Sequence, residues 1–301
     1  MLRRILFVVV IFSLCIQAVA QTDTTTKFKT RKLILASGTT VFAVGSLIGL
    51  NQAWYSAYNT GSFHFFNDNK EWLQIDKLGH SYSTYQSGRL MIDAFKWAGF
   101  SKKSQLIYGG GIGYLYMSAI EVMDGFSRGW GYSWGDQLCN TIGTSAAVSQ
   151  AALWDEQRIQ FKFSYQKSGF AKYNPSLLGN SFSTQLLKDY NAQTYWLSFS
   201  PFTFTKKYPR IPRWINLSLG YSASGMIGGF ENVKKVYDGD GNEITFERVR
   251  QFYLSFDLDL TKIKTKSKVL KSIFSCINIL KIPAPTIEFQ KNGLRLHALY
   301  Y

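Results

Sequence analysis

An abrupt change of hydrophobic period near Arg158 constrains the fold of this chain more than any other feature. Beyond Arg158 apolar and polar residues alternate, which predicts β-strands with one apolar face and one polar face. Sequential strands with short links favour an antiparallel sheet. Asn292 followed by Gly293 predicts a tight hairpin between the last two strands. We expect strands at residues 159–165, 195–199, 215–221, 252–260, 287–289 and 294–300.

The number of these strands limits how the sheet closes. The set is smaller than that of the smallest membrane barrels, although a hairpin through residues 233–237 and 244–249 would add to it. We therefore expect a partial, barrel-like sheet or a curved antiparallel sheet against the helices.

Before Arg158 the chain has the composition of helices. Three uncharged runs, residues 33–50, 104–120 and 137–154, are rich in small residues, and the first has about the minimum length that spans a bilayer core. Gly109 and Gly113 have the spacing that lets two helices pack closely. Buried helices of a soluble bundle share these properties, but we favour membrane contact. The predicted fold class is α+β, with a helical bundle first and the sheet second.

The N-terminus predicts export. Arg3 and Arg4 precede an apolar run that ends in small residues, so residues 1–20 have the pattern of a signal peptide. Leu14 stands before Cys15 where lipidation needs a small residue, which favours simple cleavage. Residues 21–32 form a polar spacer, residues 33–156 a helical domain and residues 157–301 a β domain. We expect a place in the cell envelope, in the outer membrane or at the periplasmic face of a membrane.

The charge balance indicates the kind of partner. Lys and Arg outnumber Asp and Glu by 34 to 19, a net charge of +15, which favours acidic partners. Aromatic residues make up 16% of the chain, and Trp and Tyr settle at lipid headgroups. Together with the leader, this favours membrane lipid or lipopolysaccharide over nucleic acid; it indicates no particular protein partner.

Residues 262–281 predict a basic amphipathic helix inserted in the β domain. The segment holds six lysines and no acidic residue. Such a helix can lie on an anionic membrane surface. It can equally cap the sheet with its lysines in solvent.

Pairs of polar residues interrupt the apolar sequence between residues 76 and 143. Spacings of three or four put both members of a pair on one face of a helix. Buried carboxylates need partners, so we expect the pairs to converge or to face water. The pairs are Asp76 with His80, Glu121 with Asp124, and Asp136 with Asn140, and the nearby cations are Lys77 and Arg128.

A histidine among carboxylates fits acid–base chemistry. His80 titrates near neutrality and Asp76 can orient its ring. No cofactor is predicted, although a divalent cation held by Asp76, His80, Glu121 and Asp124 is an alternative. The same residues would also serve as a network that braces three helices without turnover. The candidate catalytic residues are His80, Asp76, Glu121 and Asp136.

The motifs around these residues resemble a known family. Trp72–His80, Glu121–Gly125 and Ser133–Asp136, with Asn140 and Gly143, resemble the YfiM-like domain of unknown function, a group of predicted periplasmic lipoproteins. The resemblance covers about residues 70–154. The sheet half looks like the extended form of this family in Bacteroidetes-type envelopes. Within these motifs the candidate ligand-binding residues are Lys77, Asp124, Arg128, Ser133 and Asn140.

A more distant similarity links the same motifs to VanZ-like membrane proteins. Asp76–His80, Glu121 with Arg128, and Asp136 with Asn140 align with three blocks of that group, in which Asp124 replaces a glutamine. VanZ-like proteins are linked to glycopeptide resistance. Neither resemblance implies an established reaction.

Two functional hypotheses fit the sequence. The first is a membrane-associated envelope protein whose polar cluster binds or acts on an anionic envelope lipid or cell-wall precursor. The second is a non-catalytic outer-membrane structural or assembly protein, in which the cluster only braces the helices. A cluster open to lipid or periplasm favours the first hypothesis. A sealed, fully hydrogen-bonded cluster favours the second.

Overall fold

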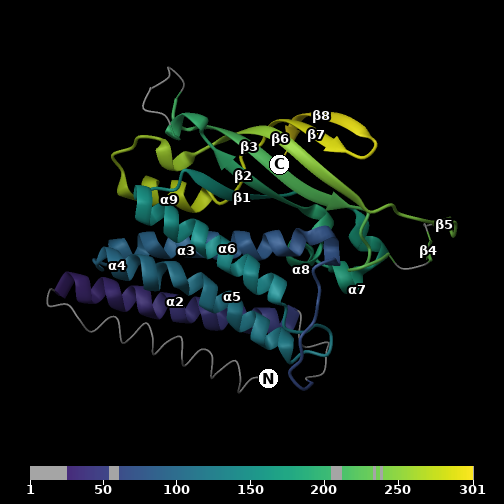
Figure 1. Cartoon of the computed structure of the whole chain (residues 1–301), viewed down its shortest axis with the longest axis horizontal. Coiled ribbons are helices and arrows are strands. Elements are labelled where there is room, and N and C mark those ends of the chain that lie inside the picture. The colour runs from purple at the N-terminus through teal and green to yellow at the C-terminus, as the bar shows by residue number, and fades with distance from the viewer. Residues whose placement is uncertain (1–25, 54–60, 205–211, 233–234, 238–239, 301) are drawn as a thin grey trace. The chain divides into compact units, whose positions relative to one another are not determined.

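The structure is a computed structural model that describes residues 26–53, 61–204, 212–232, 235–237 and 240–300. Within these residues helices precede an antiparallel sheet, so the predicted α+β class is confirmed. The chain divides into a helical unit, residues 1–68 and 83–155, and a sheet unit, residues 69–82 and 156–301 (Figure 1). The division passes through helix α3 (Ile75–Trp97). The predicted signal peptide lies outside the described residues, and the predicted domain boundaries stay predictions.

Apolar side chains of α2 and α5 pack together in the helical unit, and these two helices lie side by side in Figure 1. Leu47 and Met123 are buried in this contact, and the Tyr116 hydroxyl donates to Ser46 Oγ at 2.8 Å. Residues 28–52 of α2 are long and apolar enough to cross a membrane, a criterion of length and composition that core helices and signal sequences also meet. The helices are α2 (Thr26–Ala53), the later part of α3, α4 (Lys102–Ser104), α5 (Gly110–Gly125) and α6 (Trp134–Trp154).

Two glycines allow α3 and the α5 region to approach closely. Gly109 ends a π-helical turn, and a Cβ there would lie 3.0 Å from the Met91 carbonyl oxygen. A Cβ on Gly113 would lie 2.0 Å from Ser87 Oγ. The helix-packing interpretation of this glycine spacing is therefore confirmed, whereas contact of these helices with lipid stays a prediction.

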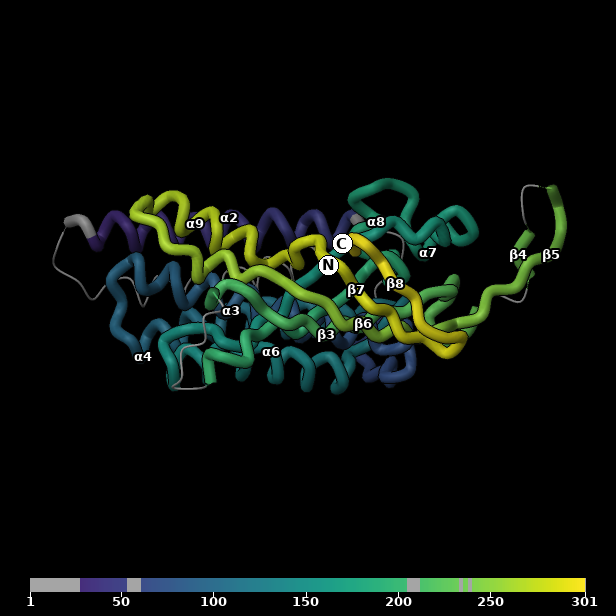
Figure 2. Tube along the Cα trace, turned by 90° about the horizontal axis from the view of Figure 1, so that it is seen from above, coloured from purple at the N-terminus to yellow at the C-terminus, as the bar shows by residue number. Residues whose placement is uncertain are grey.

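The sheet unit contains a six-stranded antiparallel sheet in the order β1-β2-β3-β6-β7-β8. Gln290 pairs with Gly293, which confirms the predicted hairpin. The short ladder β4–β5 is separate and reaches away from the sheet (Figure 2). The strands are β1 (Ile159–Tyr165), β2 (Gln193–Phe199), β3 (Ile215–Ser224), β4 (Val236–Tyr237), β5 (Glu243–Ile244), β6 (Val249–Leu258), β7 (Ala284–Gln290) and β8 (Gly293–Tyr300).

The sheet curls without closing into a barrel. Among the described residues its edge strands β1 and β8 do not pair with each other. Instead Phe163 of β1 bridges to Leu280, in the segment that leads into β7. The Phe163 amide donates to the Ile279 carbonyl at 3.1 Å, and the Lys281 amide donates to the Phe163 carbonyl at 2.9 Å. The result is a curled sheet with one edge tied to an approaching loop.

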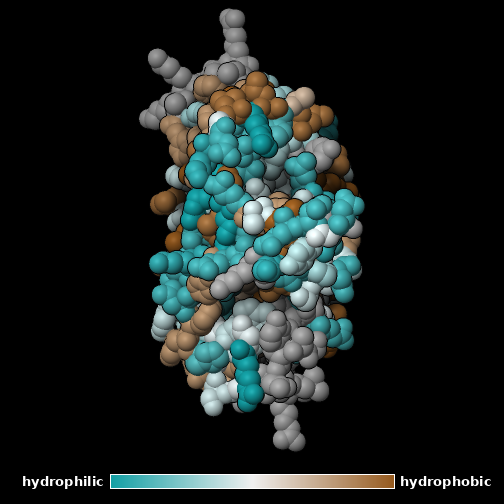
Figure 3. Space-filling model, turned by 90° about the vertical axis from the view of Figure 1, so that its right-hand side faces the viewer, coloured by the Kyte–Doolittle hydropathy of each residue, from teal (hydrophilic) through white to brown (hydrophobic). Residues whose placement is uncertain are grey.

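The two faces of this sheet carry opposite kinds of side chain. Side chains alternate between the faces along each strand, and the buried set, here called the inner face, is mostly polar. The outer face is apolar. Figure 3 shows hydrophobic residues (brown) at the surface, at the top of the view and along its edges. The inner face includes Gln160, Lys162, Ser164, Thr194, Ser198, Asn216, Ser218, Ser255, Asp257 and Glu288. The outer face includes Leu217, Leu219, Phe252, Leu254, Phe256, Ile287, Phe289, Leu294 and Leu296.

An ion pair lies at the centre of the inner face. Lys162 Nζ is 2.7 Å from Asp257 Oδ2, and both side chains are fully buried. Ser198 Oγ donates to the same carboxylate at 2.6 Å. Buried polar groups are tolerated when they are hydrogen-bonded in this way. A Cβ on Gly220 would lie 2.6 Å from the Trp196 ring, so glycine makes room for this tryptophan on the same face.

Three helices complete the sheet unit. Helix α9 is shorter than the predicted basic helix at residues 262–281, and the Ser267 hydroxyl caps it by accepting from the Leu270 amide. The expectation that Lys281 reaches solvent with the other lysines is wrong. Lys281 is buried, and its Nζ lies 4.9 Å from the centroid of the Trp196 ring. The helices are α7 (Pro175–Leu178), α8 (Phe182–Lys188) and α9 (Lys268–Ile277).

Candidate functional site

A left-handed turn introduces the first pair of candidate residues. Trp72, Leu73 and Gln74 have φ of 47°, 49° and 67°, a region that costs non-glycine residues roughly 1–2 kcal/mol each. Side chains of the sheet hold the turn, because the Tyr221 hydroxyl donates to the Leu73 carbonyl at 2.6 Å. Arg250 Nη1 donates to the same carbonyl at 3.2 Å. The turn therefore fixes where α3 begins, and Asp76 lies in its first turn.

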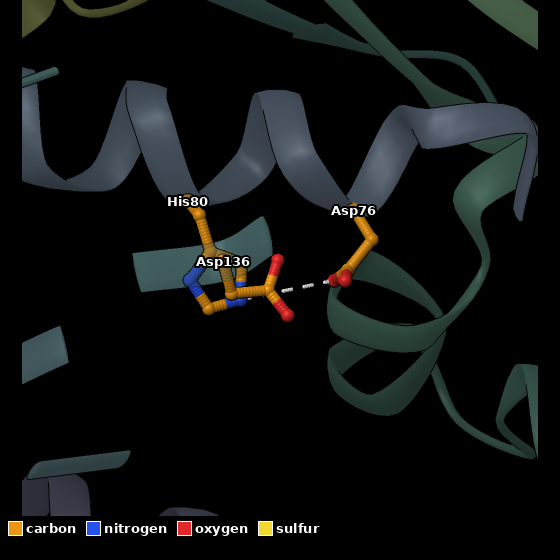
Figure 4. Close-up of side chains that lie close together, drawn as sticks. All are labelled: Asp76, His80 and Asp136. Atoms are coloured by element: carbon orange, nitrogen blue, oxygen red, sulfur yellow. Dashed lines mark ion pairs between the residues drawn. The ribbon is translucent and has the colours of Figure 1, made fainter. Parts of the chain in front are cut away.

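Asp76 and His80 lie one turn apart on the same face of α3 (Figure 4). His80 Nε2 is 4.0 Å from Asp76 Oδ1, and both side chains are largely buried, at 12% and 19% exposed. The Tyr190 hydroxyl donates to Asp76 Oδ1 at 2.7 Å, and Lys77 Nζ donates to Asp76 Oδ2 at 3.3 Å. Three side chains of different chemistry thus surround one carboxylate.

These neighbours decide the ionisation of Asp76. Burial acts to raise the pKa of this carboxyl, but the charges of His80 and Lys77 and the Tyr190 hydrogen bond outweigh burial. The pKa of Asp76 therefore lies below its usual value. An ionised Asp76 at this distance can orient the His80 ring, which is the role that the acid–base hypothesis gives to this carboxylate.

Gly79 and two tyrosines seat this part of α3 on the sheet. A Cβ on Gly79 would lie 3.0 Å from the Tyr195 hydroxyl, so a larger residue would press on that ring. The Tyr82 ring lies 5.7 Å from the Tyr195 ring, and the Tyr82 hydroxyl donates to the Ile279 carbonyl at 3.3 Å. The geometry of the Asp76–His80 pair therefore depends on packing within the sheet unit.

The remaining carboxylates lie in the helical unit, where Ser133 connects them. Glu121 on α5 is 1% exposed, and its Oε2 accepts from the Ser133 amide at 3.2 Å. Ser133 Oγ donates to Asp68 Oδ1 at 2.6 Å and accepts from the Asp136 amide at 3.1 Å, which makes Ser133 the N-cap of α6. Asp136 is thereby held, 3% exposed, in the first turn of that helix.

The other predicted residues of the helical unit occupy different environments. Asn140 is fully buried one turn after Asp136. Asp124 is half-buried near the end of α5, and Arg128 is exposed in the loop between α5 and α6. Exposure makes Arg128 a weaker candidate than Lys77 for offsetting the buried carboxylates.

The structure thus groups the candidates into two sets. Asp76, Lys77 and His80 lie together in the sheet unit. Glu121 and Ser133 are hydrogen-bonded in the helical unit, where Ser133 also caps the helix of Asp136. Convergence of the two sets on one site stays a prediction.

Sequence reasoning missed two members of these sets, Tyr190 and Asp68. Tyr190 reaches Asp76 across 114 positions, and Asp68 reaches Ser133 across 65. Helical spacing links only residues three or four apart, so no periodic signal could have found either residue. Asp68 lies four residues before Trp72 in the sequence, and its acidic side chain was the one signal that could have marked it as a candidate.

Residues 64–152 match one protein family. It is DUF2279, described as a predicted periplasmic lipoprotein. The match contains every predicted site residue and confirms the resemblance to the YfiM-like domain, while the similarity to VanZ-like proteins stays a prediction. No curated protein and no solved structure matches the chain. The family description identifies an exported protein of the cell envelope.

Proposed function

We propose that the family region of this envelope protein binds or acts on an anionic ligand, either an envelope lipid or a cell-wall precursor. His80 would transfer or hold a proton, and Asp76 would set its orientation and charge. Glu121 and Asp136 would complete the catalytic set. Lys77 is 7% exposed and would offset the charge of an anionic group.

The left-handed turn before α3 carries this proposal. Strained backbone persists only where its surroundings over-determine it, and it gathers at functional sites. Here the strain falls at Trp72, Leu73 and Gln74, directly before Asp76. The cost of this turn therefore falls directly beside the Asp76–His80 pair.

A divalent cation would reconcile the carboxylates with an anionic ligand. Two carboxylates repel a phosphate unless a cation lies between them. Asp76 and His80, drawn in Figure 4, would supply a carboxylate and an imidazole to this cation. Such a mixed set suits metals such as Mn²⁺ or Zn²⁺. The cation would act as a Lewis acid on the phosphoryl oxygen.

A structural role is the second candidate. The hydrogen bonds from Ser133 to Glu121 and Asp68 satisfy two carboxylates within the helical unit. A satisfied buried network rigidifies a fold without any chemistry. On this hypothesis the protein is a structural or assembly component of the outer membrane.

Three substitutions separate the two candidates. We would measure envelope integrity and protein abundance for His80→Gln, Glu121→Gln and Asp136→Asn in a strain that depends on this protein. A working site predicts that His80→Gln abolishes function while abundance stays nearly unchanged. A bracing network predicts that function falls only in step with abundance, because breaking a buried charged network costs roughly 3–5 kcal/mol.

A matched histidine and a metal titration complete the test. His64 is exposed in the helical unit, so His64→Gln should change neither readout. We expect the full chain to bind Mn²⁺ and His80→Gln to weaken this binding at least tenfold. Equal Mn²⁺ affinity in both proteins would remove the cation from the proposal, and loss of abundance in all three variants would overturn the site itself.

A further inference from the structure

Across β6, β7 and β8 the outer face of the sheet is apolar, and the described residues place no charged side chain in its centre. Phe252 pairs with Phe289, and Phe289 pairs with Leu294 across the next two strands. One step along, Leu254 pairs with Ile287, which pairs with Leu296. Cross-strand partners point to the same face. Two apolar rows therefore run side by side across β6, β7 and β8.

Much of this surface is exposed. Phe256 is 60% exposed and Leu296 is 74% exposed. Leu219, Phe252, Phe289 and Leu294 are also exposed large hydrophobic residues. Soluble monomers rarely expose an apolar patch of this extent, and such patches mark protein or membrane contacts.

The inner face shows which environment the outer face suits. In a sheet that faces water, the apolar side chains are buried and the polar ones are outside. Here the fully buried side chains include Lys162 and Asp257, and the apolar ones lie outside. Sheets whose outer surface meets hydrocarbon have this inverted arrangement.

Helix α9 adds a second surface of matching chemistry. Val269, Ile273 and Ile277 are 70%, 45% and 45% exposed, and none of the residues in this helix is buried. Lys264, Lys266, Lys268 and Lys271 are all exposed around them, and residues 260–282 contain no acidic residue. An amphipathic helix with a lysine-rich border is typical of contact with anionic lipid.

Cations also border the opposite end of the outer face. Phe252 and Phe289 line a cavity of about 460 Å³ together with Arg248 and Arg250. Lys291 lines the same cavity, but its Nζ pairs with Glu247 at 2.6 Å. The apolar rows therefore lie between two groups of basic residues, those of this cavity and those of the α9 region.

We propose that the outer face of β6, β7 and β8 and helix α9 form one membrane-binding surface, in which the apolar rows contact acyl chains and the bordering lysines contact anionic headgroups. The occupant is an anionic lipid bilayer. The proposal does not depend on the function assigned to Asp76 and His80, because none of those residues belongs to this surface.

Binding of the full chain to vesicles tests this proposal. Binding to vesicles of phosphatidylcholine, with and without phosphatidylglycerol, would be measured for the parent and for each variant. Phe256→Ser with Leu296→Ser should weaken binding to both vesicle types by roughly tenfold or more. Replacing Lys264, Lys266, Lys268 and Lys271 by Gln should weaken binding only to phosphatidylglycerol vesicles, by roughly 1000-fold at about 1 kcal/mol for each lysine. High salt should remove this second difference.

Leu187→Ser provides the matched control. Leu187 is 45% exposed on α8 and belongs neither to the apolar rows nor to α9, so this variant should bind both vesicle types as the parent does. All variants should melt with the parent by circular dichroism. Unchanged binding by the Phe256/Leu296 variant would overturn the proposal. So would a vesicle-free dimer that this variant dissociates, because the outer face would then cover a second copy of the chain.

Discussion

The inner and outer faces of the six-stranded sheet differ in polarity and in exposure, although the same strands form both. On the inner face Lys162 and Asp257 form an ion pair that is closed to solvent, with Ser198 as a further hydrogen-bond partner. On the outer face Phe256, the neighbour of Asp257 in sequence, is 60% exposed. The difference teaches that burial in this sheet does not follow hydrophobicity, because an ion pair and hydrogen bonds lie on its buried face while aromatic and aliphatic side chains lie on the exposed one.

Breaking the inner ion pair should have the largest effect. Lys162→Met leaves Asp257 buried without its cation, which typically costs roughly 3–5 kcal/mol. Chemical denaturation would measure the loss in free energy of unfolding. Asp257→Leu added to Lys162→Met should recover much of it, because an apolar pair of similar volume needs no charge partner. A double variant as unstable as the single one would contradict the importance of the pair.

Overfilling the inner face should cost less. Ser255 is 3% exposed and accepts from Thr286 Oγ1 at 2.8 Å. Ser255→Leu adds volume and removes this hydrogen bond, so we expect a loss of about 1–3 kcal/mol in the free energy of unfolding. Thermal melting would measure it. An unchanged melting temperature would show that the inner face has spare room, which would weaken the contrast between the two faces.

Lys281 should give the inner face a pH dependence. Burial lowers the pKa of this lysine to about 8, from an ordinary value of 10.5. Between pH 8 and 10.5 the unfolded chain would hold a proton that the folded chain has released, so the free energy of unfolding should rise with pH in this window. Lys281→Met should lose the rise. Equal slopes for parent and variant would show that Lys281 stays charged inside the fold.

The outer face should tolerate polar substitution best in water. Phe256→Ser removes an exposed ring and no hydrogen bond, so the free energy of unfolding should change by no more than about 0.5 kcal/mol. The comparison with Ser255→Leu, one position earlier on the opposite face, is the sharpest available. A large loss for Phe256→Ser would mean that the outer face is part of a core.

The helical spacing in the sequence identified the candidate residues but not their partners. Asp76 and His80 lie one turn apart as the spacing of four predicts. Tyr190 joins them because the loop before β2 folds back onto α3, a contact over 114 positions. Local periodicity carries no information on such a contact, because it depends on how a distant strand is placed.

The strands themselves were predictable for a simple physical reason. The alternation of apolar and polar residues is a property of each strand alone, so the sequence predicted the strand Ile159–Tyr165. The Asn292–Gly293 pair likewise predicted the hairpin from two adjacent residues. The bounds of the strands were harder to predict. Strand β7 extends over Ala284–Gln290, beyond the predicted residues 287–289, because its pairing with β6 and β8 continues past the apolar residues.

The sequence by itself determined the α+β class, the order of helices before strands, the alternating faces of the strands and the family region around Asp76 and His80. Each of these follows from patterns local to a few residues. Only the tertiary structure decided which face of the sheet is buried. The alternation of residues distinguishes two faces but does not say which one the curl of the sheet encloses. It also decided that Lys281 turns inward beside Trp196 while Lys268 stays exposed. A lysine follows the packing around it, and that packing is set by residues far away in the chain.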